Sequence, residues 1–123
     1  GVNRYNTRIS SLSDDWAQHH GAVQARVVQT TTLDSLINTY GRPAFVKIDV
    51  EGAEPLVLRG LTQPVPLLSF EVNLPTFRAE GEACMQRLTR LGPCQYSLDG
   101  RRWMDRNRFR ALYDAANSPI DVY

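Results

Sequence analysis

Apolar and polar residues follow patterns that change from one segment of the chain to the next. Residues 22–29 alternate between the two classes with a period of two, which predicts a β-strand. Residues 44–50 and 67–72 are almost continuously apolar, as expected of parallel strands that are covered by helices. Apolar residues at helical spacing lie between and after these segments, so the pattern predicts an alternation of strands and helices.

The expected helices have recognisable ends. Thr31 and Asp34 resemble a capping box for a helix over residues 31–40, and Gly41 followed by Pro43 would end it. The other expected helices each combine an apolar face with a start signal, and they cover residues 13–20, 53–61, 77–91 and 105–116. Strand, helix, strand, helix, strand with short links predicts parallel strands with right-handed crossovers.

The two ends of the chain have a different character. Residues 1–12 are polar and are expected to form an irregular entry segment. Residues 95–104 contain Asp99-Gly100, a typical two-residue turn, and predict an antiparallel hairpin, while residues 120–123 form a short extended end. We find no internal repeat and no linker, so residues 1–123 are interpreted as one α/β domain.

Composition excludes some classes of partner. The chain has 123 residues with 14 basic and 13 acidic side chains, and a net charge of +1 argues against nucleic acid. No apolar run approaches the roughly 20 residues of a membrane span, so no membrane partner is expected. Cys84 and Cys94 are too few for a zinc site or a disulfide framework and suit a cytoplasmic protein.

Acidic residues gather where the two apolar segments end. Lys47 and Asp49 are two residues apart and therefore share one face of their strand, and Glu51 follows in a turn with Gly52. Glu71 ends the second segment. Acids at the carboxyl ends of parallel strands indicate a ligand site. A structural ion pair would explain Lys47 equally well, and the three carboxylates could instead hold Mg²⁺.

Four motifs in this region resemble those of a known family. TTLDSL, KIDVEGAE, VLRGL and SFEV occur in the order and at the spacing of the FkbM family of S-adenosylmethionine-dependent methyltransferases, over residues 30–73. The resemblance implies part of a Rossmann-like class I methyltransferase sheet, with parallel strands and an antiparallel C-terminal hairpin. It also implies S-adenosylmethionine as the cofactor, and O-methylation of a small-molecule, sugar or glycan-linked hydroxyl group.

The resemblance assigns roles to the acidic residues. Asp49 would act as the base for the acceptor hydroxyl or would orient that hydroxyl by a hydrogen bond. Lys47 would keep Asp49 ionised or line the site, and Glu51 and Glu71 would complete an acidic pocket.

Two further residues would lie near the cofactor. Thr31 and Asp34 occupy the place where related folds contact adenine, although helix capping explains them equally well.

One part of the family pattern has no counterpart in this sequence. The glycine-rich loop that holds the methionine part of the cofactor is missing. Residues 22–29, 44–50 and 67–72 would be the third, fourth and fifth strands, and residues 95–104 would supply the last two. The third and fourth strands of such a sheet are separated by two others, so we expect an incomplete domain or a relative whose strands pair differently.

Two expectations follow from that missing part. The chain alone should bind S-adenosylmethionine weakly or not at all. The alternative is a non-catalytic module for binding or assembly, in which the strand over residues 44–50 has an open edge and pairs with a second copy as a homodimer.

Overall fold

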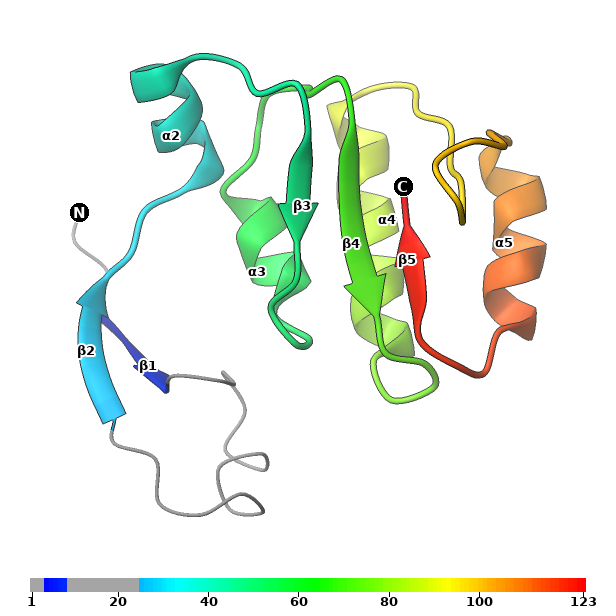
Figure 1. The fold of residues 1–123 in the computed structure, drawn as a ribbon, viewed down its shortest axis with the longest axis horizontal. Helices are drawn as coiled ribbons and strands as arrows, with labels where there is room; N and C mark the ends of the chain where they lie inside the picture. Colours follow the sequence, from blue (N-terminus) through cyan, green and yellow to red (C-terminus); the bar gives the residue numbers. More distant parts are fainter. Residues whose placement is uncertain (1–3, 9–24) are drawn as a thin grey trace.

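The computed structural model describes residues 4–8 and 25–123, and every structural statement here concerns these residues (Figure 1). The elements in chain order are β1 (Arg4–Arg8), β2 (Ala25–Gln29), α2 (Leu33–Tyr40), β3 (Val46–Ile48), α3 (Glu54–Arg59), β4 (Leu68–Val72), α4 (Arg78–Leu91), α5 (Arg106–Ala115) and β5 (Ile120–Val122). The predicted helix over residues 13–20 lies outside the described residues. No described helix is long and apolar enough to cross a membrane.

The central sheet has three strands in the order β3-β4-β5. β3 and β4 are parallel, with Val46 opposite Leu68, and α3 connects them. β5 is antiparallel to β4, with Phe70 opposite Val122. The predicted parallel pair of strands is therefore confirmed. The mixed α/β class is confirmed with it, and the arrangement is compatible with part of a Rossmann-like sheet.

The two faces of this sheet differ in chemistry. One face carries Ile48, Phe70 and Val122, which are at most 3% exposed and belong to the core that α3, α4 and α5 cover. Figure 1 shows α4 lying behind β4, on this apolar side. Because side chains alternate along a strand, Lys47 and Glu71 project from the opposite face. Helices cover one face of the described sheet, where the sequence pattern predicted cover on both.

The N-terminal strands do not join the central sheet. β2 pairs with β1 in a separate antiparallel sheet, with Arg4 opposite Gln29. The prediction of an irregular segment over residues 1–12 is thus wrong for Arg4–Arg8. The chain passes from β2 through α2 to β3, but β2 and β3 do not pair, because β3 pairs with β4 alone among the described strands. This agrees with the expectation that the strands on either side of α2 are not neighbours.

The start of α2 is one residue later than predicted. The Thr32 side chain, and not that of Thr31, accepts the N–H of Ser35 at 3.1 Å, so the predicted capping box is wrong in register. Asp34 does not complete a capping box with Thr31. Its carboxylate instead accepts a hydrogen bond from Thr62, which follows α3. At the other end of α2, Gly41 has a φ of +94° and donates its N–H to the carbonyl of Ile37.

The predicted hairpin over residues 95–104 is reduced to one bridge. Tyr96 and Met104 exchange two backbone hydrogen bonds of 2.9 Å, and a loop over residues 97–103 joins them in place of a two-residue turn. Oδ1 of Asp99 accepts the N–H groups of Arg101 and Arg102, which stabilises the longer loop. The antiparallel strand of the sheet is instead β5, in the segment that the sequence showed as a short extended end.

Candidate functional site

The turn between β3 and α3 positions the acidic residues. Glu51 and Gly52 both have positive φ angles, of 52° and 95°, which reverse the chain within a few residues. The carboxylate of Glu54, a side chain that is 4% exposed, accepts the N–H of Val50 at 3.1 Å and holds the turn closed. Glu54 is therefore a structural acid in the first turn of α3, and Asp49 and Glu51 remain exposed beside it.

A glycine is required in this turn for packing as well as for its φ angle. A Cβ atom built on Gly52 would lie 2.7 Å from Cε1 of Phe77, which precedes α4. The group that approaches the Gly52 backbone is thus the Phe77 ring, which packs against the core.

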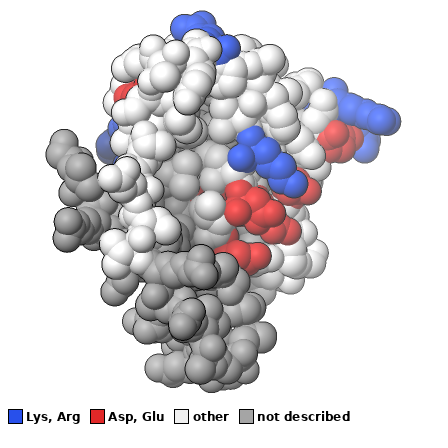
Figure 2. Space-filling model, turned by 60° about the vertical axis from the view of Figure 1, so that its left-hand side comes forward, with Lys and Arg blue, Asp and Glu red and all other residues white. Residues whose placement is uncertain are grey.

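Three carboxylates converge at the carboxyl ends of β3 and β4. Oxygen atoms of Asp49, Glu51 and Glu71 all lie within 4.8 Å of one another. The three acids therefore lie close together, because the parallel pairing of β3 with β4 brings the two strand ends together. Figure 2 shows acidic side chains gathered on this face beside a basic one. We call these three residues the carboxylate cluster.

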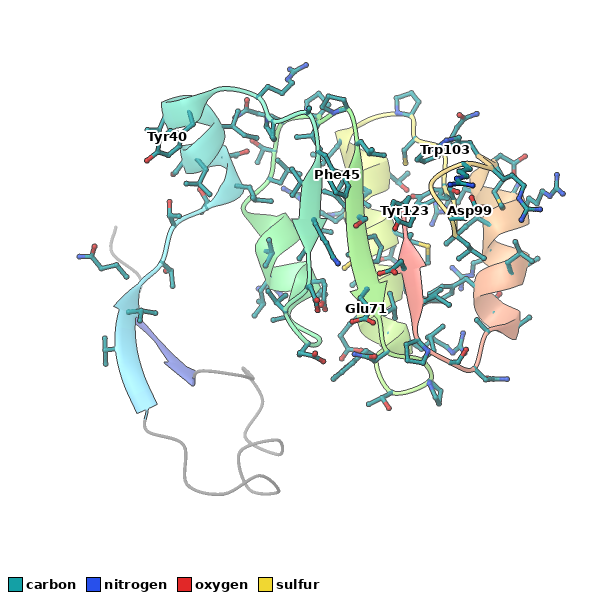
Figure 3. The ribbon with its side chains drawn as sticks, viewed as in Figure 1. Tyr40, Phe45, Glu71, Asp99, Trp103 and Tyr123 are labelled. Carbon is teal, nitrogen blue, oxygen red and sulfur yellow. The ribbon has the colours of Figure 1, made fainter. Side chains whose placement is uncertain are left out.

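Glu71 is the member of the cluster with the most perturbed ionisation. Burial raises the pKa of its carboxyl group, and the negative charges of Asp49, Asp121 and Glu51 raise it further. The positive charge of Lys47 opposes this effect. Figure 3 shows Glu71 near the end of β4, on the face of the sheet that the helices leave uncovered. The protonated form of Glu71 is thus favoured by its surroundings.

Two neighbours of the cluster were not identified from the sequence. Asn73 donates from Nδ2 to Oε2 of Glu51 at 3.2 Å and so orients this carboxylate. The sequence could have indicated Asn73, because it lies two residues after Glu71 and residues two apart share a face of a strand. Asp121 lies opposite Glu71 in β5, and this pairing needed the tertiary structure.

Lys47 does not form a structural ion pair, one of the two interpretations of its position, with any described residue. Its side chain is exposed, and no carboxylate among the described residues lies within the 4.0 Å of a salt bridge to it. Its charge nevertheless acts on Glu71 through space. Lys47 is therefore available to a ligand that binds at the cluster.

Thr31 and Asp34 lie away from the cluster. Asp34 accepts the N–H of Thr62 at 2.9 Å and its hydroxyl at 2.6 Å, and these bonds lower the pKa of Asp34. The Asp34 N–H also donates to Gly60, at the end of α3 remote from the carboxylate cluster. Both oxygens of Asp34 are thus used to hold α2 against the end of α3. The role of Thr31, which is exposed, stays a prediction.

Comparison with known proteins decides the family. Residues 3–110 match the family model described as the methyltransferase FkbM domain. The chain belongs to the FkbM methyltransferase family. The matched residues include the whole carboxylate cluster, whereas β5 with Asp121 lies beyond them. No curated protein and no solved structure matches the chain.

The carboxylate cluster is suited to two kinds of chemistry. Its carboxylates can accept a proton from a bound hydroxyl group. Three carboxylate oxygens this close could also hold a divalent cation such as Mg²⁺, which prefers oxygen ligands. The cation site requires that the three groups lie close together, as they do here, whereas proton transfer needs only one of them.

Proposed function

We propose that this FkbM domain takes part in S-adenosylmethionine-dependent O-methylation of a small-molecule or sugar hydroxyl group. The observation that carries the proposal is the convergence of Asp49, Glu51 and Glu71 at the carboxyl ends of two parallel strands. Ligands of open α/β sheets bind at this edge. Membership of a methyltransferase family supports the reaction class.

The cluster would handle the proton of the acceptor. When a hydroxyl oxygen gains a methyl group, its O–H proton must leave, and S-adenosylmethionine would supply the methyl group as an electrophile. We assign the role of proton acceptor or orienting hydrogen-bond acceptor to Asp49, whose carboxylate is exposed at the end of β3. A positioned base of this kind contributes roughly 10²–10⁴-fold to the rate.

The neighbours of Asp49 would tune this step. Lys47 has no carboxylate partner among the described residues, so its ammonium group can favour the ionised form of Asp49 or bind an acceptor oxygen. Glu71, with its raised pKa, is suited to receive the proton from Asp49. Glu51, oriented by Asn73, would bind a second hydroxyl group of the acceptor.

The described residues do not form a cradle for the whole cofactor. The turn after β3 presents carboxylates, and Asp34 has both of its oxygens bonded to Thr62. The roles assigned to the carboxylate cluster therefore concern the acceptor alone. Cofactor dependence is proposed from the family alone.

The substitution Asp49→Asn tests the proposal in the complete native protein. We expect kcat for methyl transfer to fall by about 10²–10⁴-fold, while the Kd for S-adenosylmethionine stays unchanged. The matched control is Asp114→Asn, an exposed aspartate of α5 that should leave kcat unaltered. Equal turnover of the Asp49→Asn and wild-type proteins would remove Asp49 from the mechanism.

One observation favours a second candidate function, assembly without catalysis. Among the described strands β3 pairs with β4 alone, so no described strand lies along its other edge, and Phe45 beside it is 45% exposed. Open strand edges pair with other chains. Light scattering distinguishes the candidates, because a stable dimer that binds no cofactor would favour assembly.

A further inference from the structure

Glu54 is a buried acidic residue that no step of the proposed reaction uses. It is 4% exposed, and it lines a small space in the core together with Phe77, Glu80 and Cys84. No basic side chain among the described residues lies within the 4.0 Å of a salt bridge to it. Burying a carboxylate without a cation costs free energy, so an acid at this position needs a reason.

The surroundings of Glu54 do not offset this cost. Burial raises the pKa of the Cys84 thiol to about 12, and the negative charges of Glu54 and Glu80 add to this effect. Two acids therefore act on the same part of the core with the same sign of charge. A methionine of similar length would fill the space without any charge. Packing alone does not account for an acid here.

The Glu54 side chain has one hydrogen-bond partner among the described residues, a peptide group beside Asp49. Oε1 of Glu54 accepts the N–H of Val50 at 3.1 Å. This N–H belongs to the peptide group that directly follows Asp49 in the chain. The carbonyl of Val50 accepts the N–H of Ala53 at 3.3 Å. Val50 is thus held on both sides, and Glu54 fixes the side that faces Asp49.

The backbone directly after Val50 is strained. Among the described residues, Glu51 is the one residue other than glycine with a positive φ, at 52°. Such a conformation costs about 1–2 kcal/mol, and it persists where the surrounding structure holds it in place. The hydrogen bond from Val50 to Glu54 supplies such a hold. The strain and the buried acid therefore have a common explanation, which is a turn kept in one defined shape.

We propose that Glu54 is a positioning residue of the methyltransferase site, which fixes through Val50 the direction of the Asp49 side chain. The inference rests on the proposed function, in which Asp49 accepts the proton of the acceptor hydroxyl group. Oxygen atoms of Asp49, Glu51 and Glu71 lie within 4.8 Å of one another, and the first two of these residues flank Val50. Rotation of the Val50 peptide would move both away from Glu71. A displacement of about 1 Å at a catalytic group lowers a rate by up to about 100-fold.

Three substitutions separate the hydrogen bond of Glu54 from its charge. Glu54→Gln removes the charge but keeps a side-chain oxygen that can accept the Val50 N–H. Glu54→Met has a similar length but no such oxygen, so it leaves this N–H without its partner. Glu80→Gln is the matched control, because it removes a neighbouring acid of the same space and leaves the turn as it is.

The first measurement is the pKa of Glu71 in the 123-residue chain, followed by NMR of its carboxyl carbon. Burial raises this pKa, and negative charges that include those of Asp49 and Glu51 raise it further. Glu54→Met should therefore lower the pKa of Glu71 toward its ordinary value, whereas Glu54→Gln and Glu80→Gln should leave it as in the wild type. A folded variant that is merely less stable would keep the wild-type pKa, so this measurement reports position.

The second measurement is methyl transfer by the complete native protein, in the assay that tests Asp49→Asn. Glu54→Met should lower kcat by about tenfold or more, while the Kd for S-adenosylmethionine stays unchanged. Glu54→Gln should stay within about threefold of the wild-type kcat, and Glu80→Gln should equal it.

An unchanged pKa of Glu71 in a folded Glu54→Met protein would overturn the proposal, as would an equal fall with Glu54→Gln. If Glu54→Met does not fold, amide exchange of the wild type decides. Slow exchange of the Val50 N–H supports the proposal, and exchange as fast as in an unstructured peptide overturns it. A lowered pKa of Glu71 combined with normal turnover of Asp49→Asn would refute the proposed function and leave the positioning role of Glu54 standing.

Discussion

Replacing Gly52 by alanine should destabilise the fold through the turn that carries the acidic residues. A non-glycine residue in the left-handed region costs about 1–2 kcal/mol, and Gly52 has a φ of +95°. The new Cβ would also lie 2.7 Å from Cε1 and 2.9 Å from Cζ of Phe77. Forcing a packed ring to move adds about 1–3 kcal/mol. The free energy of unfolding should therefore fall by about 2–5 kcal/mol.

The variant Gly41→Ala separates the two contributions. Gly41 has nearly the same φ, +94°, with a ψ of 171°, a combination that is essentially restricted to glycine. Nothing lies within 4 Å of its virtual Cβ, so Gly41→Ala should cost about 1–3 kcal/mol through backbone strain alone. Gly52→Ala and Gly41→Ala both reduce the conformational entropy of the unfolded chain by a similar amount. This contribution therefore cancels when the two free energies of unfolding are compared. Urea unfolding followed by circular dichroism measures the two free energies.

A double-mutant cycle identifies the group that Gly52→Ala displaces. In a Phe77→Leu background the penalty of Gly52→Ala should approach that of Gly41→Ala, because the ring edge is gone. A Gly52→Ala protein that is as stable as Gly41→Ala in the wild-type background would refute the reasoning.

Two further predictions concern the carboxylate cluster and the cofactor. The pKa of Glu71 is raised in the folded protein, so stability falls as pH rises from its unfolded pKa, about 4.3, to its raised folded value. Glu71→Gln should therefore equal wild type in Tm below about pH 4 and exceed it at pH 7, and a constant difference across this range would contradict the assigned charge repulsion. Titration calorimetry of residues 1–123 with S-adenosylmethionine should show weak binding or none, and micromolar affinity would contradict the absence of a cofactor cradle among the described residues.

The fold also explains why an acidic cluster can persist at this edge. The local sequence places acids at each strand end, and two neighbours stabilise them there. The positive charge of Lys47 opposes the repulsion on Glu71, and Asn73, which follows β4, donates a hydrogen bond to Glu51. The apolar face of the sheet, with Phe70 and Val72 each at most 2% exposed, supplies the stability that the opposite face lacks.

Local sequence determined the elements that depend on short-range patterns. The run ending at Val50 and the run ending at Val72 predicted β3 and β4, and the acids at the ends of these runs predicted the carboxylate cluster. Both predictions hold because parallel strands joined by one helix align their carboxyl ends. The family motifs lie in the same region, and the match over residues 3–110 confirms the family.

Tertiary structure alone decided which strands pair and which side chains meet. Alternation predicted β2 as a strand but could not show that its partner is Arg4–Arg8, because backbone pairing carries no sequence code of its own. Asp99-Gly100 does not form the predicted two-residue turn, because the Asp99 side chain accepts the N–H groups of Arg101 and Arg102 in a longer loop. The strand that pairs antiparallel with β4 is β5. Asp121 opposite Glu71 follows from that pairing, and Phe77 against Gly52 follows from the packing of the β3–α3 turn on the residue before α4. Each joins residues distant in the chain, so only the folded structure determines them.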